Sequence, residues 1–270
     1  MQVTMVVVVT GSTRGIGFGL AQAFASRGCS VVVSGRGQTA SKDAGEKLGA
    51  PDRVLALACD VASASQLQAL WDATIERFGR VDVWINNAGY CNSIRPFAEL
   101  PSEQIERVID ANVRGTMLGS HVAIRGFLAQ GRGQLFNMEG WGSHGETKAG
   151  MTPYCATKLA LLYFTDQLAL EHEATPIRIG TLSPGMVVTD SLVDSYREGG
   201  AASWHRSRWL FNFVIDPREV VCNWLADKVL ANDRNRAHYV WMTKLRLLGR
   251  FLNPRYWRRN PVAGTPLDTL

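Results

Sequence analysis

Hydrophobic and polar residues follow two patterns along the chain, short apolar runs and longer stretches with helical spacing. The apolar runs have the length of buried strands: Met5–Val9, Val31–Val33, Val54–Ala58, Val81–Ile85, Gln134–Met138, Ile177–Leu182 and Tyr239–Met242. Between them, apolar residues recur three and four positions apart: Ile16, Leu20, Ala23 and Phe24, then Leu67, Leu70, Trp71, Thr74, Ile75 and Phe78. Strands that alternate with helices predict an α/β fold, with one doubly wound parallel sheet of about seven strands flanked by helices.

The chain is expected to form one domain over residues 1–270. It contains no repeat, no low-complexity linker and no break in composition. The pair Asp216-Pro217 predicts the start of a further helix, with Asp216 as its cap. The longest early apolar run, Met5–Val9, is far shorter than the ~20 residues of a membrane span. The first residues also lack the pattern of a secretory signal.

The segment between the first strand and the first helix is rich in glycine. It reads Thr10-Gly11-Ser12-Thr13-Arg14-Gly15-Ile16-Gly17. Glycine allows a tight turn and a close approach of a diphosphate, and the N–H groups that start the helix attract its charge. Its place between strand and helix predicts a Rossmann-type dinucleotide site, formed by Gly11, Ser12, Thr13, Arg14, Gly15, Ile16 and Gly17.

The end of the second strand bears on the choice between NAD and NADP. An acidic residue there would hold the ribose hydroxyls of NAD. The chain instead reads Ser34-Gly35-Arg36, with no acid before Asp43. Arg36 can pair with a 2′-phosphate, and Arg14 can reach the same group. The alternative is two solvated surface arginines. We predict NADPH/NADP as the cofactor.

The chain resembles the short-chain dehydrogenase/reductase family over nearly its full length. The resemblance rests on motifs in the expected order. They are Thr10–Gly17, Asp60-Val61, Asn86-Asn87-Ala88-Gly89, Asn112, Tyr154 with Lys158, and Pro184-Gly185-Met186-Val187-Val188-Thr189. A lone Tyr-xxx-Lys is common by chance, whereas the whole ordered series is not. The resemblance implies a homodimer or homotetramer, because such assemblies are usual in the family.

Tyr154 and Lys158 stand four residues apart on an expected helix, so their side chains share one face. A neighbouring ammonium favours the phenolate and is expected to lower the pKa of Tyr154 toward the working range. By resemblance, Tyr154 protonates the carbonyl oxygen of the substrate, Lys158 also holds the nicotinamide ribose, and Asn112 supports a water-mediated proton path. The resemblance assigns cofactor contacts to Asp60, Val61, Asn86, Asn87, Ala88, Gly89, Pro184, Gly185, Val187 and Thr189.

One position departs from the family pattern. A serine about thirteen residues before the tyrosine usually binds the substrate oxygen, but here the stretch reads Phe136-Asn137-Met138-Glu139-Gly140-Trp141-Gly142-Ser143. Glu139 is a candidate catalytic residue, and the alternative is a strand-end carboxylate with no chemical role. With Trp84–Gly89 and Ser183–Asp190, this stretch resembles chlorophyll b reductases, which share the acid and glycine. Those enzymes reduce a formyl group with NADPH.

A substrate lid is expected over about 190–216 by resemblance. It contains Trp204, Trp209, Phe211 and Phe213 beside Arg206 and Arg208. Aromatic faces suit a large flat ring and arginines suit a carboxylate, but the same rings can simply bury against the core or a partner subunit.

Charge and cysteines narrow the functional classes further. The chain has 29 basic and 24 acidic residues, but eight basic residues and no acid lie between Arg234 and Leu267, so the main body is mildly acidic. This distribution argues against nucleic-acid binding. Cys29, Cys59, Cys91, Cys155 and Cys222 lack metal-ligand spacing, so we expect reduced thiols, no metal site and a cytoplasmic location, or a plastid one if a transit peptide has been removed.

The basic, aromatic tail of about 243–270 has two interpretations, peripheral membrane contact or packing on the core or on a partner subunit. The main functional prediction is an NADPH-dependent reductase of a carbonyl or formyl group, with the 7-formyl group of chlorophyll(ide) b as the substrate group that the resemblance implies. A general carbonyl reductase or alcohol dehydrogenase on a bulky hydrophobic substrate, or a non-catalytic dinucleotide-binding protein, are the alternatives.

Overall fold

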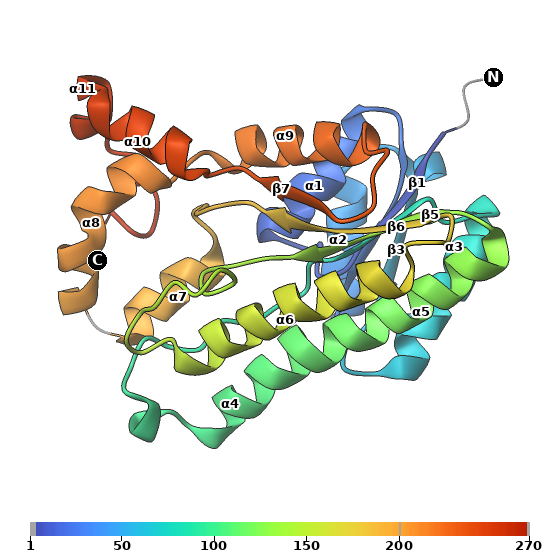
Figure 1. Cartoon of the computed structure of the whole chain (residues 1–270), viewed down its shortest axis with the longest axis horizontal. Helices are drawn as coiled ribbons and strands as arrows, with labels where there is room; N and C mark the ends of the chain where they lie inside the picture. The colour runs from blue at the N-terminus through green and yellow to red at the C-terminus, as the bar shows by residue number, and fades with distance from the viewer. Residues whose placement is uncertain (1–3, 200, 269–270) are drawn as a thin grey trace.

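A parallel sheet of seven strands forms the centre of the computed structural model, which describes residues 4–199 and 201–268 (Figure 1). Its strand order is β3-β2-β1-β4-β5-β6-β7, and every neighbouring pair is parallel. The strands are β1 (Val6–Val9), β2 (Ser30–Gly35), β3 (Val54–Ala58), β4 (Val83–Asn86), β5 (Gly133–Met138), β6 (Ile177–Ser183) and β7 (Ala237–Val240). The predicted doubly wound α/β fold is confirmed.

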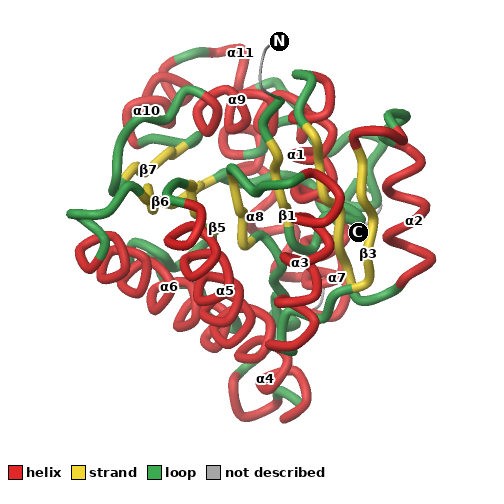
Figure 2. Tube along the Cα trace, turned by 90° about the vertical axis from the view of Figure 1, so that its right-hand side faces the viewer, coloured by secondary structure: helices red, strands yellow, loops and turns green. Residues whose placement is uncertain are grey.

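Helices cover both faces of this sheet (Figure 2). One face carries α1 (Gly15–Ser26), α2 (Gln38–Lys47) and α9 (Arg218–Leu230), and the other carries α3 (Ala64–Phe78), α5 (Gly115–Gln130) and α6 (Thr152–Glu171). Successive β1 valines point to opposite faces, so Val7 and Val9 pack with Phe24, whereas Val8 packs with Leu70. Shorter helices are α4 (Ser102–Val108), η1 (Pro51–Arg53) and η2 (Phe97–Glu99).

The remaining helices follow β6 and β7 and form a third apolar cluster. They are α7 (Asp190–Gly199), α8 (Ala201–Val214), α10 (Lys244–Leu252) and α11 (Pro254–Trp257). In Figure 1, α8, α10 and α11 lie together at one end of the molecule. The ring of Phe213 on α8 stacks on Phe251 of α10, with centroids 4.3 Å apart. None of the helices in the described part of the chain is long and apolar enough to cross a bilayer.

The carboxyl ends of β1 and β4 meet where the strand order reverses, the usual ligand position in such sheets. A side-chain carbon added to Gly11 would lie only 2.7 Å from the Cα atom of Ala88. The Thr10 hydroxyl oxygen accepts hydrogen bonds from the backbone N–H groups of Asn87 and Ala88, both at 3.1 Å. The glycine turn and the segment after β4 are therefore joined directly, backbone against backbone.

Asp216 is a buried carboxylate that ties the C-terminal segment to the rest of the domain. It accepts hydrogen bonds from Trp241 Nε1 and Arg250 Nη2, both at 2.6 Å, and Arg259 lies 3.4 Å away. The prediction that Asp216 caps the next helix is wrong, because Pro217 occupies the N-cap position of α9. The side chain of Asp216 instead faces three donors that are close only in the folded chain.

The contact with Asp216 also explains the position of the last strand. β7 ends at Val240, two residues earlier than the predicted Tyr239–Met242. Trp241 turns its indole toward Asp216, and Met242 packs beside Gly185, whose added side-chain carbon would lie 3.1 Å from the Met242 Cβ atom. Apolarity alone could not mark this strand end.

We expect Asp216→Ala to lower the free energy of unfolding by about 3 kcal/mol, because it leaves buried Arg250 without its counter-charge. Urea denaturation measures the change, and limited proteolysis should cut residues 244–268 first. Asp194→Ala is the matched control, since its ion pair with Arg197 is exposed and should contribute little. Equal stability of the two variants would contradict the role given to Asp216.

Candidate functional site

The glycine turn packs tightly on the polar segment after β4. A side-chain carbon at Gly17 would lie 2.4 Å from both the amide nitrogen of Asn87 and the carbonyl oxygen of Gly11. Asn87 Nδ2 donates to the carbonyl oxygens of Thr10 at 2.9 Å and of Gly11 at 3.0 Å. The structure thus brings together Gly11, Gly17, Asn87 and Ala88, which the sequence placed in one cofactor site.

The residues around the turn fit a dinucleotide. Gly15 has a φ of +58°, and an added side-chain carbon there would be 3.5 Å from Thr189. The start of α1, with Gly15 and Ile16, therefore faces the loop after β6, and its first N–H groups are suited to a diphosphate. Within that loop Val187 is buried in the core, whereas the Thr189 hydroxyl accepts from Leu192 N–H at 3.3 Å and caps α7.

The end of β2 lies beside the same turn. An added carbon at Gly35 would be 2.6 Å from the methyl group of Thr13, so the next residue, the exposed Arg36, is adjacent to the turn. Ser12 donates to the carbonyl oxygen of Val9 at 2.6 Å, which holds the turn against β1. Arg14 is exposed and lies 3.5 Å from Asp190 at the start of α7.

Asp60 and Val61 follow β3, the strand that pairs with β2. The Asp60 carboxylate accepts from the N–H group of Ala62 at 3.0 Å. Val61 is buried, and an added carbon at Gly115 would lie 2.6 Å from it. The two residues therefore lie between the end of β3 and the start of α5.

Tyr154 and Lys158 lie one turn apart on α6 and meet two glycines from other elements. An added carbon at Gly140, after β5, would be 2.3 Å from the Tyr154 hydroxyl oxygen and 3.1 Å from Lys158 Cε. One at Gly89, after β4, would be 3.9 Å from Lys158 Nζ. The buried Lys158 ammonium donates to the carbonyl oxygen of Met138 at 3.0 Å. Gly140 thus leaves room for the tyrosine hydroxyl.

The proton affinities of this pair differ from the prediction. Burial raises the pKa of Tyr154 above its ordinary value of 10.0, and the neighbouring Cys91 and Cys155 add to the rise. The expected lowering by Lys158 is wrong in this structure, where the ammonium lies 5.8 Å from the ring centroid. Burial lowers the pKa of Lys158 to about 8. Tyr154 therefore keeps its proton at neutral pH, the form that can act as an acid.

Asn112 lies in η3 (Ile109–Arg114), a π-helical turn between α4 and α5. Its Oδ1 atom accepts from Tyr90 N–H at 2.8 Å, and its Nδ2 atom donates to Tyr90 O and Thr157 Oγ1, both at 3.0 Å. An added carbon at Gly89 would be 3.1 Å from Asn112 Oδ1. Asn112 is therefore placed beside Gly89, which also adjoins Lys158.

Glu139 is buried at the end of β5 and is held by three side chains. Its Oε1 atom accepts a hydrogen bond from the Thr181 hydroxyl, and its Oε2 atom lies 2.9 Å from His144 Nε2. His238 Nδ1 is 2.8 Å from the Thr181 oxygen and 3.7 Å from Glu139 Oε1, while its Nε2 atom is 3.3 Å from Asp166. Both carboxylate oxygens are thus occupied within this network.

The hydrogen bonds of this network keep the carboxyl group of Glu139 ionised. Burial would raise the pKa of the carboxyl group, but the hydrogen bonds from His238, Thr181 and His144 outweigh burial and lower it to about 2. The hydrogen bond to Glu139 is in turn the main cause of the raised pKa of His238. Ser143, the hydroxyl nearest to the usual serine position, accepts from the N–H group of Gly140 at 3.1 Å and is buried in the turn.

Sequence reasoning missed the partners of Glu139. Thr181 and His238 face each other across the β6–β7 pair, and Asp166 lies on α6. The only local signal was His144, five residues after Glu139. Thr181 and His238 come near Glu139 through the register of β6 and β7, and Asp166 through the position of α6. No sequence motif identifies these residues.

The expected lid is formed by α7 and α8, and most of its aromatic residues pack inward. Trp204, Phe211 and Phe213 are buried, with Trp204 and Phe211 centroids 5.1 Å apart, whereas Trp209 is exposed. The side chain of Arg206 lies outside the described residues, and Arg208 pairs with Asp268 at 2.9 Å. Tyr154 packs against this apolar cluster, so the tyrosine faces a hydrophobic environment on the lid side.

Comparison with known proteins agrees with this geometry. Residues 5–198 match the family model described as short chain dehydrogenase. The chain is 32% identical to "Chlorophyll(ide) b reductase NOL, chloroplastic" of Oryza sativa subsp. japonica, over 86% of this chain and 68% of that protein. Its Arabidopsis thaliana counterpart is also 32% identical, over 83% of this chain and 65% of that protein, so the chain spans about two thirds of their length.

A solved structure supports the same assignment. A variant of the actinorhodin polyketide ketoreductase with NADPH superposes with a TM-score of 0.79 at 26% identity, covering 89% of this chain and 97% of that one. A nicotinamide dinucleotide therefore fits the glycine turn described above.

Glu139→Gln should be less stable than the wild type by about 3 kcal/mol at neutral pH, since each pKa unit represents ~1.4 kcal/mol. Because the pKa falls from 4.5 to about 2 on folding, this contribution is full above pH 4.5 and is lost as the pH falls toward 2. Denaturant titrations across this range measure the difference. The exposed Glu76→Gln is the control. A stability gap that does not narrow in acid would contradict the assignment.

Proposed function

Because the chain belongs to the short-chain dehydrogenase family, we propose that it is an NADPH-dependent reductase that converts an aldehyde into a primary alcohol. The observation that carries this proposal is the convergence of Tyr154, Lys158 and Asn112 on Gly89 and Gly140. Gly89 continues the segment that packs on the glycine turn, so the tyrosine acid stands next to the expected cofactor site.

The reaction needs a hydride and a proton at opposite ends of one carbonyl bond. Bound NADPH supplies the hydride to the carbonyl carbon. The hydroxyl group of Tyr154 donates its proton to the carbonyl oxygen, and its raised pKa keeps that proton in place until the oxygen becomes basic. Lys158 is anchored on the carbonyl oxygen of Met138, with its ammonium group beside Gly89, where it would hold the nicotinamide ribose of the bound cofactor. Asn112 orders the backbone at Tyr90 near the same point.

Glu139 is assigned a positioning role in this mechanism rather than contact with the substrate. Its carboxylate oxygens are occupied by Thr181 and His144, while its backbone N–H group donates to Leu182 O at 2.8 Å. These bonds fix the strand end that leads into Gly140, and Gly140 borders the tyrosine hydroxyl. Glu139 therefore acts on the reaction through the placement of Gly140.

The proposed substrate is the formyl group of chlorophyll b or chlorophyllide b. The named activity of the two plant relatives supports it, as does the apolar cluster against which Tyr154 packs. A general carbonyl reductase would share the chemistry but accept simple aldehydes equally well.

Assembly and location form part of the same proposal. A homodimer or homotetramer is favoured by the exposed Leu159 and Tyr163, which lie one turn apart on α6, since large apolar side chains on one helix face suit a subunit contact. All five cysteines are free, which fits a reducing compartment. The cytoplasm is one such compartment, and the plastid is favoured if the substrate is the pigment of the chloroplastic relatives.

Tyr154→Phe should lower the turnover of chlorophyllide b by about 100-fold or more, because the ring still packs but the proton is gone. NADPH oxidation with chlorophyllide b and with a simple aldehyde is the assay, and cofactor fluorescence checks that binding survives. Tyr163→Phe, on the exposed side of the same helix, is the matched control. Cofactor binding without turnover of either aldehyde by the wild type would favour a non-catalytic protein. Similar rates on both would favour a general reductase.

Arg36→Ala should raise the KM for NADPH about tenfold or more and leave that for NADH unchanged, since it removes a charge-assisted bond to the 2′-phosphate. Arg178 is an exposed arginine at the start of β6, the end of the strand away from the loop that contains Thr189. Arg178→Ala should therefore leave the KM values for NADPH and NADH unchanged. Equal catalytic efficiency of the wild type with both cofactors would overturn the preference for NADPH.

A further inference from the structure

Helix α10 has an apolar face on each side. Leu247 and Phe251 pack into the third apolar cluster, and buried Arg250 pairs with Asp216. On the other side, Leu245, Leu248 and Leu252 are 80%, 55% and 76% exposed. Their spacing of three and four residues places them on one stripe of the helix. Single exposed leucines are common, but three on one stripe form a surface that is free to meet a partner.

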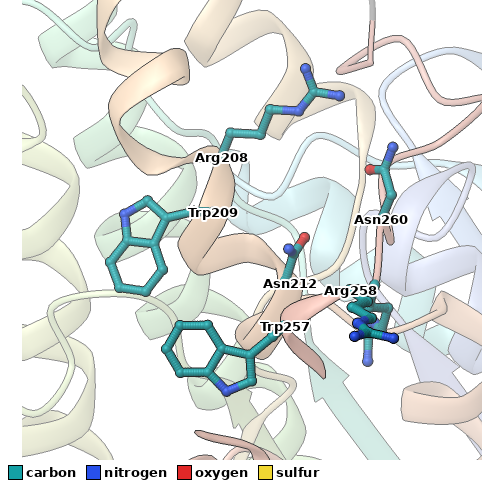
Figure 3. A pocket seen from close by; sticks show the side chains of 7 residues that line it. Arg208, Trp209, Asn212, Trp257, Arg258 and Asn260 are labelled. Atoms are coloured by element: carbon teal, nitrogen blue, oxygen red, sulfur yellow. The ribbon is translucent and has the colours of Figure 1, made fainter. Parts of the chain in front are cut away.

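Two exposed tryptophans lie against Phe251 of the same helix. Trp257, at the end of α11, and Trp209, on α8, are 57% and 55% exposed. They stand at an open groove of about 480 Å³, which Arg208 and Arg258 also line (Figure 3). The ring of Phe213 is 5.1 Å from that of Trp257, so the tryptophan is supported from the core. Tryptophan favours the boundary between water and lipid.

The charged residues of α10 and α11 themselves are all basic. Lys244, Arg255 and Arg258 are exposed, and none of them forms an ion pair with a described residue. The only acid after Asp233 is Asp268, which pairs with Arg208. The buried arginines of the segment are used internally, whereas the exposed cations are available for an anionic partner.

We propose that Leu245, Leu248, Leu252 and Trp257, with Lys244, Arg255 and Arg258, form a docking surface for an anionic lipid bilayer. Leucines enter the apolar boundary while the cations meet the headgroups, as for helices that lie in a membrane interface. A second copy fits less well, because a twofold pairing of this face would bring the same cations together. The surface is already folded on the domain, so docking needs no ordering of the helix.

The proposal goes beyond the reductase activity and does not depend on it. Its experiment uses the full chain and vesicles of phosphatidylcholine with phosphatidylglycerol, with pure phosphatidylcholine vesicles beside them, read by co-sedimentation. Truncation after Met242 is unsuitable, because it would remove Arg250 and Phe251 from the core. The test variant is Leu245→Gln with Leu252→Gln. The matched control is Leu128→Gln with Leu170→Gln, two half-exposed leucines in the last turns of α5 and α6.

The wild type and the control should bind the anionic vesicles, and binding should weaken as salt screens the cations. The test variant should bind about tenfold or more weakly, because two apolar side chains no longer enter the lipid. Size-exclusion chromatography and circular dichroism check that each variant keeps its assembly and fold. Absence of vesicle binding at low salt, or equal binding by the two double variants, would overturn the proposal. A smaller assembly for the test variant without vesicle binding would assign the face to a second copy.

Discussion

The site depends on one close contact between backbones, that of the glycine turn with the segment after β4. An added carbon at Gly11 would lie 2.7 Å from the Cα atom of Ala88, so no larger residue fits without displacement. The hydroxyl of Thr10 and the amide of Asn87 lock the two segments together. This contact fixes Gly89, and Gly89 in turn adjoins Asn112 and Lys158. The proposed cofactor site and the proposed site of proton transfer are thus set by the same constraint.

Two buried charged groups of this site, Lys158 and Glu139, have different surroundings. Lys158 is buried with a carbonyl oxygen as its hydrogen-bond acceptor, so burial lowers its pKa to about 8. Glu139 is also buried, but three donors keep it ionised with a pKa of about 2. The lysine therefore lies close to its titration range at neutral pH, whereas the glutamate is a fixed charge. A charge that stays fixed at the end of β5 can hold the loop that follows this strand. For this reason Glu139 is assigned a positioning role rather than a place among the reacting groups.

The sequence could predict what depends on neighbours along the chain. Alternating apolar runs predicted the parallel sheet, and spacing placed Tyr154 and Lys158 on one helix. Features that depend on contacts between residues distant in the sequence could not be predicted. Helix-start rules suggested that Asp216 is a cap, but Trp241, Arg250 and Arg259 bind it in the fold. The expected lowering of the Tyr154 pKa failed for a similar reason, because the degree of burial follows from packing and not from spacing.

Helix α10, in the C-terminal segment, has one face packed on the domain and one face exposed. Its buried arginine and aromatic residue hold it against α8, with Phe213 stacked on Phe251. The outer leucines Leu245, Leu248 and Leu252 stay 80%, 55% and 76% exposed, so they bury little apolar area against the domain itself. Their exposure carries a solubility cost that inner packing does not explain. Helix α8 contacts α10, and its buried residues share the third apolar cluster with Tyr154. In the proposed function, binding at the outer face of α10 and entry of the substrate past the expected lid therefore involve the same helix.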